Sequence, residues 1–118
     1  MFLRVIEDTS KMNRQTILSP CRNYRYVLWR EWDVLNPTYA MFVGLNPSTA
    51  DEMADDPTIR RYIDYAKRWD YGALCMANLF AYRATAPTVM KAVSQPIGVE
   101  NDRSMAESAE DAGVIIAA

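Results

Sequence analysis

The chain has 118 residues, of which 50% are hydrophobic and 24% charged, and its formal net charge at neutral pH is −2. This length predicts one domain, residues 1–118, with the composition of an ordinary globular protein rather than a disordered one. The slightly acidic charge does not indicate nucleic-acid binding through bulk electrostatics, although a local basic face remains compatible with such binding.

The chain contains two cysteines and no histidine. These are too few for a four-ligand zinc site or an iron–sulfur cluster, so we expect no metal and no cofactor, and we interpret Cys21 and Cys75 as reduced thiols. Without histidine, acid–base catalysis must use other polar side chains. The absence of a long apolar run and of a signal peptide predicts a cytoplasmic protein with no membrane partner.

The N-terminal part of the chain gives weak signals. Residues 1–20 form a poorly defined segment, in which Phe2–Ile6 is predicted to be an edge strand followed by a polar loop. Aromatic and β-branched residues alternate in Tyr24–Trp32, which predicts a strand. After a turn, Tyr39–Val43 is predicted to be a second strand, antiparallel to the first.

A helix is predicted to follow the sequence Asp55-Asp56-Pro57, because an acidic cap and an early proline are typical of helix starts. Apolar residues from Ile59 to Trp69 recur at spacings of three and four and predict a buried helix face. Gly72 is expected to adopt the left-handed conformation that ends the helix.

The remaining elements complete an alternating pattern. Ala73–Phe80 is predicted to be a strand buried on both faces and parallel to Tyr39–Val43. A short helical turn at Thr88–Val93 and a helix at Glu100–Ala112 precede a last buried strand, Val114–Ala118. Strands that alternate with helices predict an α/β fold of three layers, α/β/α, with a central, mostly parallel sheet.

The last predicted strand ends at Ala118 with no covering helix after it. Because both faces of a parallel strand are normally covered, we expect either a neighbouring chain over this strand or a C-terminally truncated domain, and we favour truncation. The uncovered strand also predicts self-association.

The polar turn after Tyr39–Val43 is the first place to expect a ligand, since ligands bind at the carboxyl ends of such strands. Gly44 permits a sharp turn or a close approach to a ligand, and Pro47 stiffens the loop. Asn46 offers an uncharged donor and acceptor that suit a bound water or a base edge. The alternative is an Asx turn, in which Asn46 satisfies only the local backbone.

An acidic cluster follows the turn. One of its carboxylates is a candidate general base, and several together would bind Mg²⁺. Helix capping explains Asp55 and Asp56, so Asp51 is the preferred catalytic candidate. Arg60 is a candidate for contact with anions near the turn, the alternative being a solvated position or an ion pair with the acidic cluster.

Further substrate-binding candidates lie on both loops. Ser48 and Thr49 either bind a phosphate or cap the loop. Asn78 ends a buried strand, where a polar residue is unusual. Tyr82 and Arg83 suit the stacking of a base and the binding of a phosphate, the alternative being a packed tyrosine with a surface arginine.

Residues 21–118 resemble a bacterial and phage family, domain of unknown function 1643, through the stretches YRYVLWREWD, VGLNPSTADEMADDPTIRRYIDYAKRWDYG and NLFAYRATAP. This resemblance implies a distant likeness to the uracil-DNA glycosylase superfamily and its parallel sheet. In the mismatch-specific branch the first motif is Gly-x-Asn-Pro-Gly, and its Asn holds the attacking water. Gly44-Leu45-Asn46-Pro47 is similar to it, with Ser48 in place of the last Gly. Ala77–Phe80 and Arg83 resemble the segment in which an Asn, here Asn78, contacts the flipped base.

The superfamily's second catalytic motif, a late His-Pro-Ser turn, has no counterpart in these 118 residues. The resemblance therefore implies a glycosylase-like domain that binds a nucleobase, a nucleotide or nucleic acid and hydrolyses an N-glycosidic bond with a water on Asn46. The alternative is a non-catalytic binding or interaction module, such as an inactive truncated protein.

Overall fold

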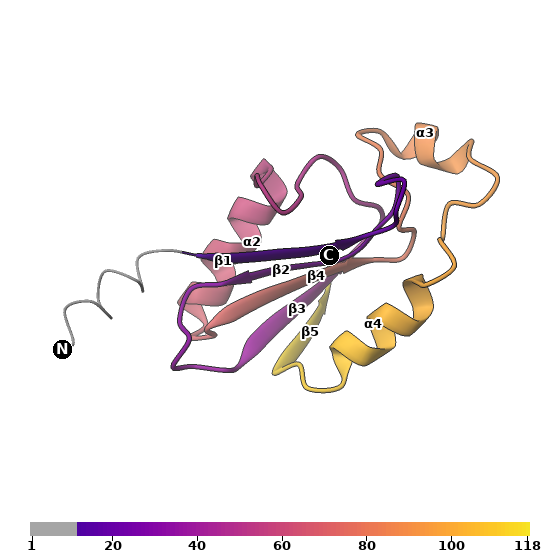
Figure 1. Cartoon of the computed structure of the whole chain (residues 1–118). Coiled ribbons are helices and arrows are strands. Elements are labelled where there is room, and N and C mark those ends of the chain that lie inside the picture. The colour runs from indigo at the N-terminus through magenta and orange to yellow at the C-terminus, as the bar shows by residue number, and fades with distance from the viewer. Residues whose placement is uncertain (1–11) are drawn as a thin grey trace.

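The structure is a computed structural model that describes residues 12–118, and its fold is a mixed α/β arrangement (Figure 1). In chain order the elements are β1 Asn13–Leu18, β2 Arg25–Glu31, β3 Tyr39–Gly44, α2 Pro57–Arg68, β4 Ala73–Asn78, α3 Pro87–Lys91, α4 Asn101–Ala109 and β5 Val114–Ala117. The strands form one five-stranded sheet in the order β1-β2-β4-β3-β5. The strand predicted at Phe2–Ile6 lies outside the described residues.

The sheet combines antiparallel and parallel pairs. β1 with β2 and β2 with β4 are antiparallel, whereas β3 is parallel to both β4 and β5. The prediction of a mostly parallel sheet is therefore not confirmed beyond the β4-β3-β5 part. β2 and β3 run in opposite directions, as predicted, but they are not neighbours, because β4, which is buried along its whole length, lies between them.

Strand β1 is absent from the sequence prediction. Four of its six residues are polar and most are exposed, so its sequence NRQTIL shows no alternation of apolar and polar positions. Its partner β2 is buried and aromatic, and the pairing of Thr16 with Leu28 lies in the middle of their ladder. Long-range pairing therefore determines this strand, and the structured region begins before residue 21.

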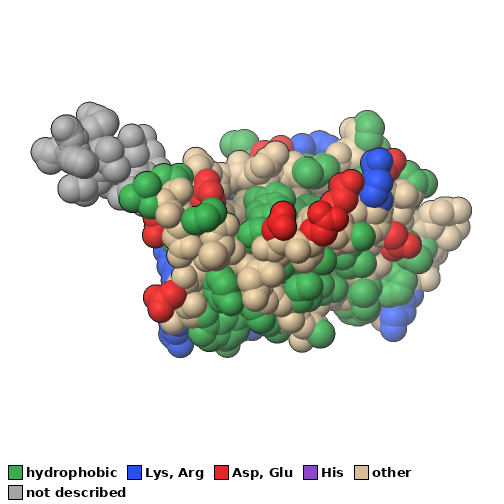
Figure 2. Space-filling view, turned by 90° about the horizontal axis from the view of Figure 1, so that it is seen from below, with side chains coloured by type: hydrophobic (Ala, Val, Ile, Leu, Met, Phe, Trp, Pro, Cys, Tyr) green, Lys and Arg blue, Asp and Glu red, His purple; other side chains and the backbone are tan. Residues whose placement is uncertain are grey.

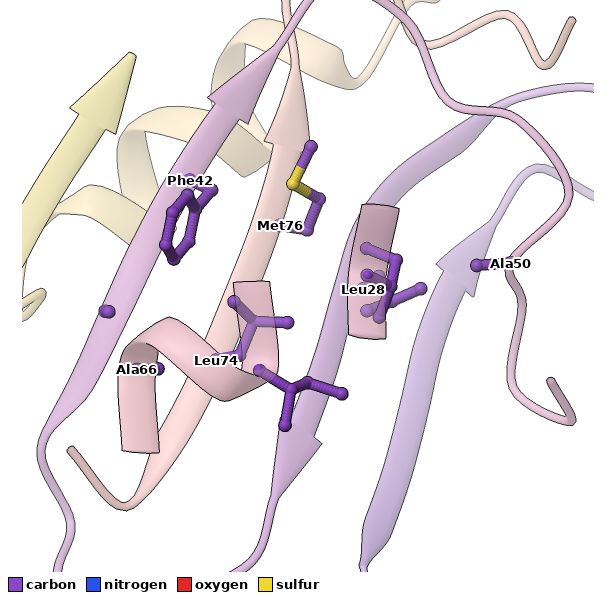
Figure 3. Close-up of a cluster of buried hydrophobic side chains, with 9 residues drawn as sticks. Leu28, Phe42, Ala50, Ala66, Leu74 and Met76 are labelled. Atoms are coloured by element: carbon purple, nitrogen blue, oxygen red, sulfur yellow. The ribbon is translucent and has the colours of Figure 1, made fainter. Parts of the chain in front are cut away.

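One helix packs on each face of the sheet. Successive residues of β4 point to opposite sides, so that Leu74 and Met76 join the cluster under α2 while Cys75 faces α4. Figure 3 shows Phe42, Leu74 and Met76 of adjacent strands beside Ala66 of α2. The strongly apolar β4 is thus covered on both faces, as the sequence predicts.

The start of α2 follows the prediction and its end does not. The Asp56 carboxylate accepts a hydrogen bond from the Ile59 backbone N–H at 2.9 Å, which caps the helix. At the other end Asp70, not Gly72, has positive φ, at 65°. Gly72 is required for space, because a Cβ there would lie 2.0 Å from the Asn36 carbonyl oxygen.

The last strand, β5, lies at the edge of the sheet, so the expected burial is wrong. Its residues alternate between half-buried and exposed, and Ile115 is 53% exposed because α4 packs over β2 and β4 instead. Among the described residues only β3 pairs with it. Self-association through this strand stays a prediction. No helix within residues 12–118 combines the length and hydropathy needed to cross a bilayer.

Candidate functional site

The loops that follow β3 and β4 meet at one edge of the sheet. The parallel register pairs Gly44 with Asn78, so both strands end at the same level. Backbone N–H groups of Leu79 and Phe80 donate to the carbonyls of Gly44 and Leu45, each at 2.9 Å. The two loops therefore form one continuous wall at the edge where α/β proteins place ligands.

Between these loops, β2 and the start of α2 lies a small cavity, here called the inner pocket, of about 60 Å³. Several polar side chains reach it from segments far apart in sequence. Its lining consists of Arg25, Asn46, Pro47, Ser48, Asp56, Thr58, Ile59, Met76 and Asn78.

Asn46 bridges the two loops. Its Nδ2 atom donates to the carbonyl oxygens of Ala84 at 2.9 Å and Pro47 at 3.2 Å. The Oδ1 atom accepts no hydrogen bond from any residue in 12–118, so the Asx turn considered for this position does not form. An oriented amide with an unused acceptor is suited to hold a water or to bind an N–H group of a ligand.

Asn78 is 1% exposed and is fixed through its oxygen. Its Oδ1 atom accepts from Arg25 Nη2 at 3.2 Å, and its backbone carbonyl accepts from Asn101 Nδ2 at 2.8 Å. A Cβ on Gly44 would lie 2.9 Å from Asn78 Nδ2. Gly44 is therefore needed for the close approach of Asn78.

Arg25 is a site residue that the sequence interpretation does not include. It is 2% exposed, and its Nη1 atom donates to the Ala50 carbonyl at 3.1 Å. Burial lowers the pKa of its guanidinium to about 10, so the group remains charged at neutral pH. An arginine inside an aromatic strand is the available sequence signal, but Arg30 of the same strand shares it.

The three aspartates of the acidic cluster all have structural partners. Asp51 Oδ1 accepts from the backbone N–H groups of Met53 at 2.8 Å and Ala54 at 3.0 Å, which caps the turn. Asp55 pairs with Arg30 at 2.7 Å, and Asp56 caps α2. Asp51, predicted as catalytic, does not line the inner pocket. Within the described part of the chain no three potential metal ligands cluster together.

A second, open depression adjoins the first and is here called the outer pocket, of about 430 Å³. It is lined by Arg22, Asn23, Ser48, Thr49, Arg83, Ala84 and Thr85. Ser48 lines both pockets and so joins them.

Two arginines give the outer pocket its charge. Arg83 donates to the carbonyls of Ser48, Thr49 and Arg22 at 3.2 to 3.4 Å and pairs with no carboxylate of residues 12–118. Arg22 is held by Glu52, with N–O distances of 2.8 and 2.9 Å, and these hydrogen bonds lower the pKa of the Glu52 carboxyl to about 2. Arg83 is therefore the arginine whose charge is available to a ligand.

Two predicted residues lie away from both pockets. Arg60 donates to the Asp55 carbonyl at 3.1 Å on the exposed side of α2. The Tyr82 ring packs edge-on against Tyr24, with 5.5 Å between the ring centroids. Neither side chain lines the inner or the outer pocket, so the structure does not bring them to the other candidates.

A larger hollow of about 510 Å³ lies over β1 and β2, lined in part by Trp29 and Tyr39. It is near the amino ends of β3 and β4 and contains none of the predicted site residues.

On the face shown in Figure 2, acidic side chains lie among hydrophobic ones and basic side chains are mainly at the margins. That face therefore does not favour an anionic ligand.

Comparison with known proteins gives one family. No curated protein and no solved structure matches the chain. A family model described as "Protein of unknown function (DUF1643)" matches residues 25–118, which include β2 to β5 and the whole lining of the inner pocket. Because the match covers most of the sequence, the chain belongs to the DUF1643 family of proteins of unknown function.

Proposed function

We propose that the protein binds a nucleotide or nucleic acid at the two pockets and hydrolyses an N-glycosidic bond, as a glycosylase-like domain. One observation carries the proposal: Asn46 and Asn78, at the carboxyl ends of adjacent parallel strands, converge on the inner pocket with Arg25 from the start of β2. The parallel β4-β3-β5 part, with a helix on each face, supports the likeness to uracil-DNA glycosylases in fold.

The two pockets suit different parts of such a ligand. In the outer pocket, Arg83 provides a guanidinium for a phosphate, and Ser48 and Thr49 line the same depression. The inner pocket, at about 60 Å³, admits the polar edge of a base together with a water rather than a whole ring. Asn78 and Asn46 supply amide groups there, which can donate to and accept from a base edge.

Asn46 has the central role in the proposed hydrolysis. Its unused Oδ1 accepts a hydrogen from a water and directs the water oxygen toward the C1′ carbon of the sugar. The carbon–nitrogen bond to the base breaks and the base leaves with the electron pair. The water oxygen bonds to C1′, and the water proton passes to the departing base, so that the products are a sugar hydroxyl and a neutral base. Positioning of this kind makes the attack effectively unimolecular.

The alternative is a non-catalytic binding module, and a specific observation favours it. Asp51, Asp55 and Asp56 are engaged in a turn cap, an ion pair and a helix cap. Asp51 and Asp55 do not line the inner pocket, and both oxygens of Asp56, which does, accept from backbone N–H groups, so none of the three is placed as a free base for the water.

The decisive measurement is base release from uracil-containing and mismatch-containing oligonucleotides, together with their binding. We expect the parent to release base, and Asn46→Ala to reduce the rate about 100-fold, the usual effect of removing one positioned polar group. Binding should change little, because Arg83 and Asn78 remain. Asn13→Ala, an exposed asparagine that pairs with Glu31, is the matched control and should behave as the parent.

The outcomes separate the two functions. Binding without release by the parent would support the non-catalytic module. If the parent binds no nucleotide or oligonucleotide and releases no base, both the glycosylase-like function and the nucleotide-binding module are overturned.

A further inference from the structure

The two arginines of β2 are both buried but have opposite environments. Arg30 is 0% exposed, and its Nε donates to Asp55 at 2.7 Å while its other nitrogens donate to carbonyls, among them that of Trp29 at 2.9 Å. Arg25 is 2% exposed and donates only to neutral acceptors, the Ala50 carbonyl and the Asn78 amide. Arg30 therefore forms an ion pair within the fold and Arg25 does not.

The buried Arg25 also has an unused donor. Its Nε–H is enclosed and has no acceptor in residues 12–118. No carboxylate in that range forms an ion pair with it. Asp56 lines the same pocket, but its oxygens accept from the backbone N–H groups of Ile59 and Ala50. A buried charge without an ion-pair partner is unfavourable, so a negatively charged group from outside the chain would stabilise Arg25.

The surroundings of the inner pocket are also suited to negative charge. Asn78 Nδ2 and the hydroxyl groups of Ser48 and Thr58 make no hydrogen bond to any described residue. The pocket also borders the first turn of the twelve-residue helix α2, where the helix dipole is positive. Burial lowers the pKa of Arg25, the charge of Asp56 opposes this shift, and the nearby positive charge of Arg83 adds to it.

We propose that the inner pocket is an oxyanion site, in which Arg25 binds a negatively charged oxygen of the ligand with help from Asn78 and Ser48. Two parts of a nucleotide carry such an oxygen: the phosphoryl group, and the oxo group of a base that is ionised at a ring nitrogen. The identity of the natural ligand rests on the proposed function. Anion binding by Arg25 does not require hydrolysis, so it can be tested separately.

The test uses inorganic phosphate as the probe, at constant ionic strength, with calorimetry and thermal unfolding of the 118-residue chain. We expect phosphate to bind the parent and raise its melting temperature more than chloride does. Arg25→Gln should weaken phosphate binding about tenfold or more, since hydrogen bonds to charged groups are worth about 1.5–3 kcal/mol. Arg61→Gln, a change at an exposed arginine of α2, is the control and should leave binding unchanged.

A second variant keeps the proposal testable if Arg25→Gln fails to fold. Asn78→Asp places a carboxylate of the same shape against Arg25 Nη2 and supplies the missing charge from inside the fold. We expect this variant to have a higher melting temperature without phosphate and to lose the response to phosphate. A less stable Asn78→Asp variant that keeps the full phosphate response would overturn the proposal.

Competition identifies the source of the oxygen. Phosphate that competes with a nucleoside monophosphate but not with the matching nucleoside would assign the site to the phosphoryl group. Competition with the nucleoside would assign the site to the base, and both results support the site.

Phosphate binding that is unchanged in Arg25→Gln and lost in Arg83→Gln would overturn the proposal and place the anion in the outer pocket. Phosphate binding in a protein that neither binds nor cleaves oligonucleotides would refute only the proposed function.

Discussion

The two halves of the segment between β3 and α2 have different roles. Residues 46–49 line the pockets and leave polar atoms unused, among them Asn46 Oδ1. Residues 51–56 use their carboxylates within the fold, with Asp51 capping a turn and Asp55 paired with Arg30. The first half has the features of a binding surface, and the second those of its support.

Residues 51–56 are held in place mainly by the anchor residue Arg30. Arg30 donates to the backbone carbonyls of Asp51 and Ala54 as well as to the Asp55 side chain. The segment is thus fixed at one end by β3 and at the other by Arg30 and the helix start. Unused polar groups in residues 46–49 keep their positions because both ends are held, which is how preorganised sites retain their geometry.

The largest expected effect comes from removing this anchor. Arg30→Met removes the main partner of Asp55, whose side chain is only 13% exposed, and leaves the loop carbonyls without their donor. We expect the free energy of unfolding to fall by about 3–5 kcal/mol, measured by urea denaturation. Arg14→Gln is the control, because Arg14 contacts the same carboxylate at 3.1 Å from a 36% exposed position and should cost at most about 1 kcal/mol. Equal, small losses for both variants would show that Arg30 is not the anchor.

The parts of the fold that could be predicted are those encoded by neighbouring residues. Helix α2 has its cap, its proline and its apolar stripe within one segment, and β4 is apolar throughout. Strand β1 and the position of β4 between β2 and β3 depend on pairing between distant segments. The polar sequence of β1 does not predict that pairing.

The site residues also divide into those that the sequence predicts and those that only the structure shows. Asn46 and Ser48 follow β3 and Asn78 is the last residue of β4, which ends two residues before the predicted Phe80, and all three line the inner pocket. The capping role of Asp51 depends on where the loop places the N–H groups of Met53 and Ala54, which no spacing rule gives. Arg25 was not predicted as a site residue, because only the folded structure shows that it has no carboxylate as an ion-pair partner, whereas Arg30 has Asp55.

A smaller effect is expected at the first half, where Gly44 makes room for Asn78. In Gly44→Ala the new Cβ would lie 2.9 Å from both Asn78 Nδ2 and Met76 Cε. We expect a loss of about 1–3 kcal/mol in the free energy of unfolding, typical of overpacking, together with weaker phosphate and nucleotide binding.

Gly113→Ala is the matched control for this variant. Its Cβ would lie 2.6 Å from Tyr71 Cε1, away from both pockets. It should also destabilise the protein while leaving ligand binding unchanged. Unchanged binding in Gly44→Ala would show that the position of Asn78 does not matter to the site.

The smallest effect concerns Glu52, the member of the second half that holds Arg22 at the outer pocket. The hydrogen bonds from Arg22 lower the pKa of the Glu52 carboxyl from 4.5 to about 2. A carboxyl whose pKa is lowered on folding stabilises the folded state above its unfolded pKa, and this stabilisation is lost as the pH falls toward the folded value. Glu52→Gln should therefore be less stable than the parent near neutral pH, and the difference in unfolding free energy should shrink from about pH 4.5 toward about pH 2.

The side chains of Arg22 and Glu52 are both exposed, so solvent screening keeps this effect small. Urea denaturation across this acidic range measures it, and a difference that does not change with pH would mean that Glu52 acts through packing rather than through its charge.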